Sequence, residues 1–139
     1  MEKIIVNTDG GARGNPGPAG IGVVVSNEKG EVLKEHAAFL GNGTNNFAEY
    51  QAVATALNIL KKHFGKKTKD MAFEVKLDSE LVQKQLSGEY QIKEPGLVPL
   101  FVEIHNFCVA SFPHITFTHV RREQNKRADE LANEAMDGE

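Results

Sequence analysis

The chain reads Thr8-Asp9-Gly10-Gly11-Ala12-Arg13-Gly14-Asn15-Pro16-Gly17-Pro18-Ala19-Gly20 where its first β-rich run, Lys3 to Asp9, comes to an end. Glycine and proline in this stretch predict a loop or turn from Gly10 to Gly20. Further along, the pattern predicts a strand from Ile21 to Ser26, a hairpin turn at Asn27–Gly30 and a returning strand from Glu31 to Leu40. Together these segments predict a meander of three antiparallel strands.

The rest of the chain alternates helical and strand patterns. After a loop at 41–46, apolar residues at helical spacing predict a helix up to about His63, with Asn46 as N-cap and Glu49 reaching back to it. The order β-β-β-α-β-α-α-β-α predicts an α/β fold with helices on the faces of one mixed sheet, in a single domain spanning residues 1–139. The later predicted elements are a strand at Phe73–Asp78, a short helix capped by Ser79, helices at Leu97–Phe112 and Asn125–Met136, and a strand at Ile115–Val120.

Composition narrows the class of protein. The 139 residues are 40% hydrophobic and 25% charged, as expected of one ordinary globular domain. No apolar run approaches the roughly 18 residues of a membrane span, and the start lacks the apolar region of a signal peptide. The single cysteine, Cys108, lies in an apolar stretch and is expected to be a small packed hydrophobe. We therefore expect a cytoplasmic protein without a membrane partner.

The net charge of −3 disfavours a simple electrostatic binder of nucleic acid. Basic residues nevertheless cluster in two places, and such clusters are most often solvated faces. Bound divalent cations would supply the positive charge that the protein lacks. The two clusters are Lys61, Lys62, His63, Lys66, Lys67 and Lys69, and then Arg121, Arg122, Lys126 and Arg127.

Four acids stand at positions that suggest a site. Asp9 and Asp78 both end predicted strands, at the edge where open α/β sheets place their sites. Glu49 shares a helix face with alanine, valine and leucine and should point towards the core. Asp129 stands beside the apolar stripe of the last helix.

Each acid also has a plain structural explanation. Aspartate is common in turns, a first-turn glutamate favours the helix dipole, and Asp129 could pair with Lys126 or Arg127. Four carboxylates that converge in a partly buried site, however, repel one another and need a cation to stay ionised. Oxygen ligands without histidine or cysteine favour Mg²⁺ or Mn²⁺ over zinc.

Four blocks of the sequence resemble the signature blocks of type 1 ribonuclease H. They occur in the family's order, and the resemblance covers essentially the whole chain. The first block is highly specific, and the others are informative at these spacings. The blocks are Thr8 to Gly20, Thr44-Asn45-Asn46-Phe47-Ala48-Glu49-Tyr50, Asp78-Ser79-Glu80 and Asn125-Lys126-Arg127-Ala128-Asp129-Glu130-Leu131-Ala132.

The resemblance implies a five-stranded mixed sheet in the order 3-2-1-4-5 and an endonuclease that hydrolyses the RNA strand of RNA–DNA hybrids. It implies two-metal-ion catalysis with Mg²⁺, for which Mn²⁺ can substitute, giving 5′-phosphate and 3′-hydroxyl ends. Asp9 would bridge the two ions, Glu49 and Asp78 would hold one of them, and Asp129 would complete the other.

The resemblance also implies which residues read the substrate. The Gly10–Gly14 backbone, including Gly11, Ala12 and Arg13, would face 2′-hydroxyls with Asn45 and Glu49. Phosphate contacts would come from Asn15, Thr44 and Asn46, some of them on the DNA strand. The plain alternative is that these glycines build a turn and these asparagines cap a helix.

The chain departs from the family pattern in three places. A basic, tryptophan-bearing insertion is missing between the short helix and the next long one. Its absence suggests that the substrate is bound more weakly, or that the second basic cluster binds it instead. The loop before Asp129 lacks a histidine; His119 is expected to pack inside a strand, and Arg122 is the candidate auxiliary residue, in an electrostatic role. Glu80 stands where some members carry glutamine and could alter substrate contacts.

Two other functions compete with hybrid cleavage. One is a binding domain without turnover, which the four retained acids disfavour; the other is a related 3′-exonuclease or resolvase, which the glycine- and asparagine-rich blocks disfavour. The resemblance leaves double-stranded RNA open as a second substrate. We expect a monomer that requires no protein partner.

Overall fold

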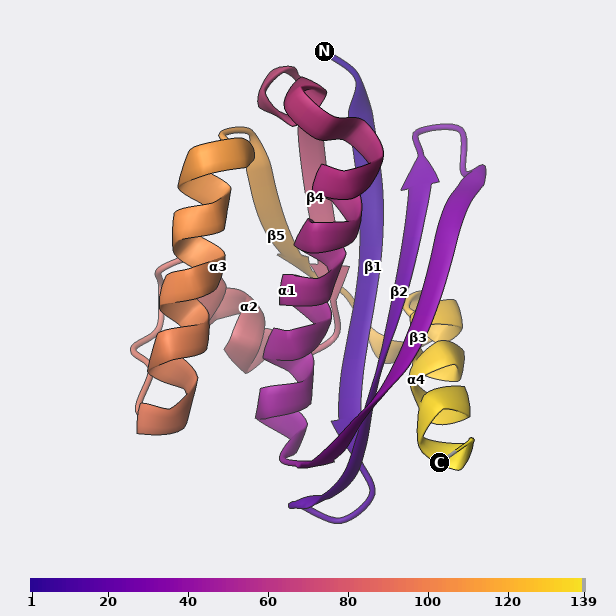
Figure 1. Ribbon diagram of the computed structural model, residues 1–139, viewed down its shortest axis with the longest axis vertical. Coiled ribbons are helices and arrows are strands. Elements are labelled where there is room, and N and C mark those ends of the chain that lie inside the picture. The colour runs from indigo at the N-terminus through magenta and orange to yellow at the C-terminus, as the bar shows by residue number, and fades with distance from the viewer. Residues whose placement is uncertain (139) are drawn as a thin grey trace.

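The computed structural model describes residues 1–138 and confirms the predicted order of elements (Figure 1). The strands are β1 (Lys3–Ala12), β2 (Gly17–Asn27), β3 (Val32–Gly43), β4 (Ala72–Leu77) and β5 (Ile115–His119). The helices are α1 (Asn45–Phe64), α2 (Glu80–Leu86), α3 (Val98–Ser111) and α4 (Lys126–Asp137), with short 3₁₀ helices at Gly65–Asp70, Pro95–Leu97 and Arg122–Gln124.

The five strands form one sheet in the order β3-β2-β1-β4-β5, as the family resemblance implied. β1 lies at the centre, antiparallel to β2 and parallel to β4, and β4 is parallel to β5. The antiparallel half follows from two short connections, residues 13–16 between β1 and β2 and residues 28–31 between β2 and β3. The parallel half requires crossovers, which α1 and the α2–α3 segment provide. The central strand, β1, therefore has one antiparallel and one parallel neighbour.

Helices cover both faces of the sheet, and alternate residues of β2 explain why. Val23 and Val25 point into the main core, which α1 closes, whereas Val24 packs against Ala128 and Leu131 of α4 on the opposite face. α1, α2 and α3 thus lie on one side of the sheet and α4 on the other (Figure 1). β2 is nearly continuously buried, as expected for a strand covered on two faces.

The predicted loop from Gly10 to Gly20 is wrong for most of its length. β1 continues through Ala12 and β2 begins at Gly17, because Gly11 pairs with Gly20 and Ala12 with Ala19 in the antiparallel ladder. β3 likewise continues to Gly43, inside the predicted second loop, where it pairs with Gly17. The glycines favour turns locally, but here their backbone groups form hydrogen bonds to neighbouring strands instead.

The start of α1 also differs from the expectation. Thr44 is the N-cap, with its Oγ1 accepting from the backbone N–H of Phe47 at 3.1 Å. The predicted cap, Asn46, lies inside the helix, and Glu49 does not reach back to a cap. Ser79, by contrast, caps α2 as predicted, accepting from the N–H of Val82 at 3.2 Å.

Two glycines allow helices to approach the sheet closely. A Cβ atom on Gly10 would lie 2.2 Å from the carbonyl oxygen of Ala48 in α1. A Cβ atom on Gly22 would lie 2.1 Å from the carbonyl oxygen of Ala128 in α4. Neither position can take a larger residue. The two close contacts determine how near to the sheet α1 holds Glu49 and α4 holds Asp129.

Three smaller expectations have clear outcomes. Over residues 1–138, the helices are too short or too polar to cross a membrane. Cys108 is half-buried against the main core, and burial raises the pKa of its thiol to about 11, which suits a packing role. The prediction of a packed His119 is wrong, because this residue ends the edge strand β5 and is exposed.

Candidate active site

Three of the four predicted acids meet at one edge of the sheet. Asp9 lies inside β1, three residues before its end, so the prediction that it ends the strand is wrong; pairing with β2 extends β1 to Ala12. Asp78 directly follows β4, as predicted, and Glu49 is the fifth residue of α1. The parallel register places Asn7 opposite Lys76, so Asp9 and Asp78 stand opposite each other two residues further on. Each of the three side chains offers a carboxylate oxygen, and these oxygens lie within 4.8 Å of one another.

Glu49 is held by the strand beneath it. The backbone N–H of Gly10 donates to Glu49 Oε1 at 2.8 Å, and only 5% of Glu49 is exposed. Since Gly10 has no side chain, α1 can come close enough for this bond to form. The predicted core-facing direction of Glu49 is confirmed.

Burial and mutual repulsion disfavour the charged forms of the two buried acids. Burial raises the pKa of Asp9 far above its usual range, and the charges of Glu49 and Asp78 raise it further. The pKa of Glu49 is also raised, chiefly by burial, while the N–H of Gly10 opposes the rise by favouring the carboxylate. A cation at this site would therefore replace a proton.

Asp129 lies beside this cluster, on α4. It lines the same cavity as the three acids, and its side chain is 30% exposed. It also helps to raise the pKa of Asp9 as a hydrogen-bonding partner. Arg122 approaches it, with Nη2 4.0 Å from Asp129 Oδ1, but Arg122 remains 80% exposed. The plain alternative, an ion pair of Asp129 with Lys126 or Arg127, is not formed among the described residues.

One positioning residue was missed by the sequence reasoning. Asn125 is 1% exposed; its Nδ2 donates to the carbonyl of Thr8 at 2.8 Å, and its Oδ1 accepts from Asn7 at 3.0 Å. Its own carbonyl accepts from the N–H of Asp129 at 3.1 Å. Asn125 thus ties the start of α4 to β1 beside Asp9. In the sequence, the position of Asn125 before the last helix predicted only the start of that helix. Its hydrogen bonds to β1 could not be predicted locally, because both partners are about 117 residues away.

Most of the predicted substrate contacts surround the acids. A cavity of about 450 Å³ contains all four carboxylates, and it is lined also by Gly10, Gly11, Ala12, Arg13, Asn45, Asn46 and Arg122. Asn45 is oriented at both ends, because its Oδ1 accepts from Ala12 N–H and its own N–H donates to Asn15. The remaining predicted contacts lie outside this lining: Gly14, Asn15, Thr44 and Glu80.

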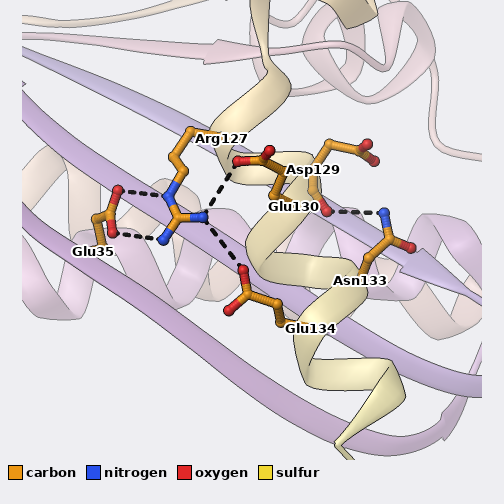
Figure 2. A network of polar contacts seen from close by, with 6 residues as sticks. All are labelled: Glu35, Arg127, Asp129, Glu130, Asn133 and Glu134. Atoms are coloured by element: carbon orange, nitrogen blue, oxygen red, sulfur yellow. Dashed lines mark hydrogen bonds and ion pairs between the residues drawn. The ribbon is translucent and has the colours of Figure 1, made fainter.

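Arg127, a member of the second basic cluster, is engaged elsewhere. Figure 2 shows its guanidinium between Glu35 of β3 and Glu130 and Glu134 of α4, while the Asp129 carboxylate points away from it. Both nitrogens that face Glu35 donate to it, at 2.8 and 2.9 Å. This arrangement joins α4 to β3. The charge of Arg127 is therefore already balanced by these carboxylates, although the sequence had suggested this residue for substrate binding.

The acidic cluster fits divalent cations. Its oxygens converge without histidine or cysteine, two of its members are buried, and none of the three forms an ion pair within residues 1–138. A larger cavity, about 670 Å³, lies between α2, α3 and β5, but its lining is mainly apolar and contains none of the four acids. The smaller cavity is therefore the candidate active site.

The raised pKa values predict how the metal-free protein responds to pH. A raised carboxyl pKa contributes stability that is fully present below the unfolded-state value, about 4, and is lost as the pH rises through the folded-state value. We therefore expect the free energy of unfolding in EDTA to fall between about pH 4 and neutral pH. Urea unfolding at a series of pH values measures it.

The control for this measurement is the double variant Asp9→Asn, Glu49→Gln, which should lose much of that slope. Mg²⁺ at neutral pH should recover stability in the wild type but not in the double variant. Equal slopes in the two proteins would contradict the prediction.

Most of the chain is similar in sequence to known proteins. Residues 7–135 match the model of a family described as reverse transcriptase-like. Ribonuclease HI of Halobacterium salinarum is 39% identical over 132 residues, covering 93% of this chain and 62% of that protein. A bifunctional protein of Mycobacterium tuberculosis is 39% identical over 136 residues, covering 97% of this chain. The chain spans only 36% of the length of that mycobacterial relative.

Two solved structures are similar to this chain over nearly its whole length. LC11-RNase H1, isolated from compost by a metagenomic approach, superposes with a TM-score of 0.95 at 53% identity, covering 99% of this chain and 98% of that one. A second structure of LC11-RNase H1, in complex with an RNA/DNA hybrid, superposes with a TM-score of 0.93 at 52% identity and covers 97% of each chain.

Proposed function

The chain belongs to the type 1 ribonuclease H family, and from this membership and the acidic site we propose that it hydrolyses the RNA strand of RNA–DNA hybrids. The observation that carries the proposal is the convergence of Asp9, Glu49 and Asp78 within 4.8 Å at the edge of the sheet. The LC11-RNase H1 structure with an RNA/DNA hybrid supports the substrate class. Cleavage would be internal and leave 5′-phosphate and 3′-hydroxyl ends.

Two Mg²⁺ ions, or Mn²⁺ in their place, would lower the pKa of water and neutralise charge that develops on the scissile phosphate. Asp9 would contribute to both ions, Glu49 and Asp78 would hold one of them, and Asp129 would hold the other. The protein's own contribution is to fix these acids in position: Gly10 orients Glu49, and Asn125 orients the start of α4.

The substrate-binding residues would act around this centre. The backbone of Gly10, Gly11, Ala12 and Arg13 lines the cavity beside the acids, where it would recognise a 2′-hydroxyl together with Asn45 and Glu49. Asn46 lies at the start of α1, where its amide can donate to phosphate, and Gly14, Asn15, Thr44 and Glu80 would contact substrate further out.

Arg122 is proposed as an auxiliary residue that acts on the charge of Asp129. We expect Arg122→Ala to lower kcat about fivefold, the scale of one exposed charge pair, and to leave KM for the hybrid nearly unchanged. Arg122→Lys should retain most of kcat because it keeps the positive charge. Steady-state kinetics measures both variants; a change confined to KM would indicate a binding role instead.

The proposal is tested by incubating end-labelled RNA–DNA hybrid, double-stranded RNA and double-stranded DNA with the protein and Mg²⁺, and in parallel with EDTA. Internal cuts in the RNA strand of the hybrid, absent with EDTA, are the expected result. Hybrid that is bound but never cut would contradict it and favour a binding domain. The double-stranded RNA lane decides whether that duplex is a second substrate.

We also propose that residues 1–139 act as one domain and as a monomer. Among residues 1–138, a single sheet on which α1, α2 and α4 pack, with α3 packed against α1, supports one domain. Sedimentation equilibrium at assay concentrations tests the monomer, for which a mass near 15.3 kDa is expected.

A further inference from the structure

The segment between α2 and α3 places an acid on the start of α1. Glu94 Oε1 accepts from Asn46 Nδ2 at 2.8 Å, across 48 positions of sequence. Asn46 is the second residue of α1 and lines the cavity that contains the four carboxylates. The donor that the proposed function assigns to a backbone phosphate of the substrate therefore faces a carboxylate of the protein itself.

The charge of Glu94 is not offset by a base. Among residues 1–138 no ion pair involves Glu94, and its hydrogen-bonded partner is a neutral amide. α1 has no acid in its own first turn, so Glu94 supplies the negative charge there. Glu94 is also exposed, so its side chain is free to swing away when another anion arrives.

A phosphate that approaches Asn46 would meet two obstacles. One of the two amide hydrogens of Asn46 is already donated to Glu94, and the carboxylate repels the phosphate at a distance where like charges interact appreciably even in water. A carboxylate and a phosphate thus compete for one donor. The substrate phosphate must therefore displace the Glu94 carboxylate from Asn46 before it can take its place.

We propose that Glu94 is an affinity-determining residue for the nucleic-acid substrate, which competes with the substrate phosphate for Asn46. This inference rests on the proposed function, in which Asn46 is a phosphate contact. Glu94 does not touch the reacting atoms, so it should act on KM and on salt dependence and leave the chemical step alone.

Two substitutions separate charge from hydrogen bonding. Glu94→Gln keeps an acceptor for Asn46 and removes the charge, whereas Glu94→Ala removes both. The matched control is Glu89→Gln, which removes one negative charge from the same segment, where Glu89 pairs with Lys84 instead of Asn46. Melting temperatures of all the variants show that the fold is kept.

The measurement is KM and kcat for an end-labelled RNA–DNA hybrid with Mg²⁺ over a range of salt concentrations. We expect Glu94→Gln to lower KM about fivefold at low salt, with kcat within about twofold of wild type. Glu94→Ala should lower KM at least as far. In both variants the slope of log KM against log salt should steepen by up to about 0.9, because one negative charge that repels the phosphates is removed. Glu89→Gln should leave KM and the slope near the wild-type values.

The outcomes separate the inference from the function. A wild type that cuts the hybrid, with KM unchanged or raised in both Glu94 variants, would overturn the inference and leave the proposed function standing. An equal fall in KM for Glu89→Gln would also overturn it, because the effect would then be one of general charge. A wild type that neither binds nor cuts the hybrid would overturn both.

Discussion

Replacing Asp9 by asparagine is expected to reduce hybrid cleavage by about a thousandfold or more while making the metal-free protein more stable. Glu49, Asp78 and Asp129 all act on the Asp9 carboxylate, and carboxylate oxygens of Asp9, Glu49 and Asp78 lie within 4.8 Å of one another. An amide keeps the shape of the side chain but removes the charge that would hold cations. Loss of charge stabilisation worth several kcal/mol accounts for the fall in rate.

The gain in stability has the same cause as the loss of activity. At neutral pH the folded metal-free protein must either take up a proton on Asp9 or keep a carboxylate that is 7% exposed and repelled by its neighbours. Asparagine removes this cost, so we expect the free energy of unfolding in EDTA to rise by on the order of 2 kcal/mol, and Tm by about 5–10 °C. The gain should shrink near pH 4.

Thermal unfolding in EDTA and cleavage of labelled hybrid in Mg²⁺ measure the two effects. Asp70→Asn is the matched control, since Asp70 is exposed and lies outside the acidic cavity. It should change neither quantity noticeably. An active Asp9→Asn protein, or one less stable than wild type without metal, would contradict this account of the site.

Gly22→Ala is expected to cost about 2–4 kcal/mol of stability, although alanine is the smallest possible addition. The new Cβ atom would lie 2.1 Å from the carbonyl oxygen of Ala128 and 2.8 Å from Leu131 Cβ. Because backbone cannot swing aside, α4 must move away from β2. Activity should fall as well, since α4 carries Asp129.

Urea unfolding and hybrid cleavage measure this prediction. Gly96→Ala is the control: no heavy atom lies within 4 Å of its added Cβ, and its stability should stay within about 0.5 kcal/mol of wild type. A Gly22→Ala protein as stable as Gly96→Ala would show that α4 is not held by close contact with β2.

Periodicity and spacing in the sequence predicted the order of elements, and they pointed to Asp9, Glu49 and Asp78, which the structure brings together. Alternation in Phe73–Asp78 and the helical spacing after Glu49 are local signals, and each survives in the fold. Element ends were less predictable. Gly10 to Gly20 was expected to form a loop, but most of it joins the ladder of β1 and β2, because unpaired backbone groups gain more from a neighbouring strand than from a turn.

Partners far apart in the chain were decided only by the tertiary structure. No local pattern shows that Asn125 would bond to Thr8, that Arg127 would turn to Glu35, or that Glu94 would reach Asn46. The sequence alone therefore determined which residues could build an acidic metal site, since their types and spacings carry that chemistry. The packing of α1 and α4 against the sheet decided which of them meet and which charges are already engaged, because such contacts depend on strand register and helix depth.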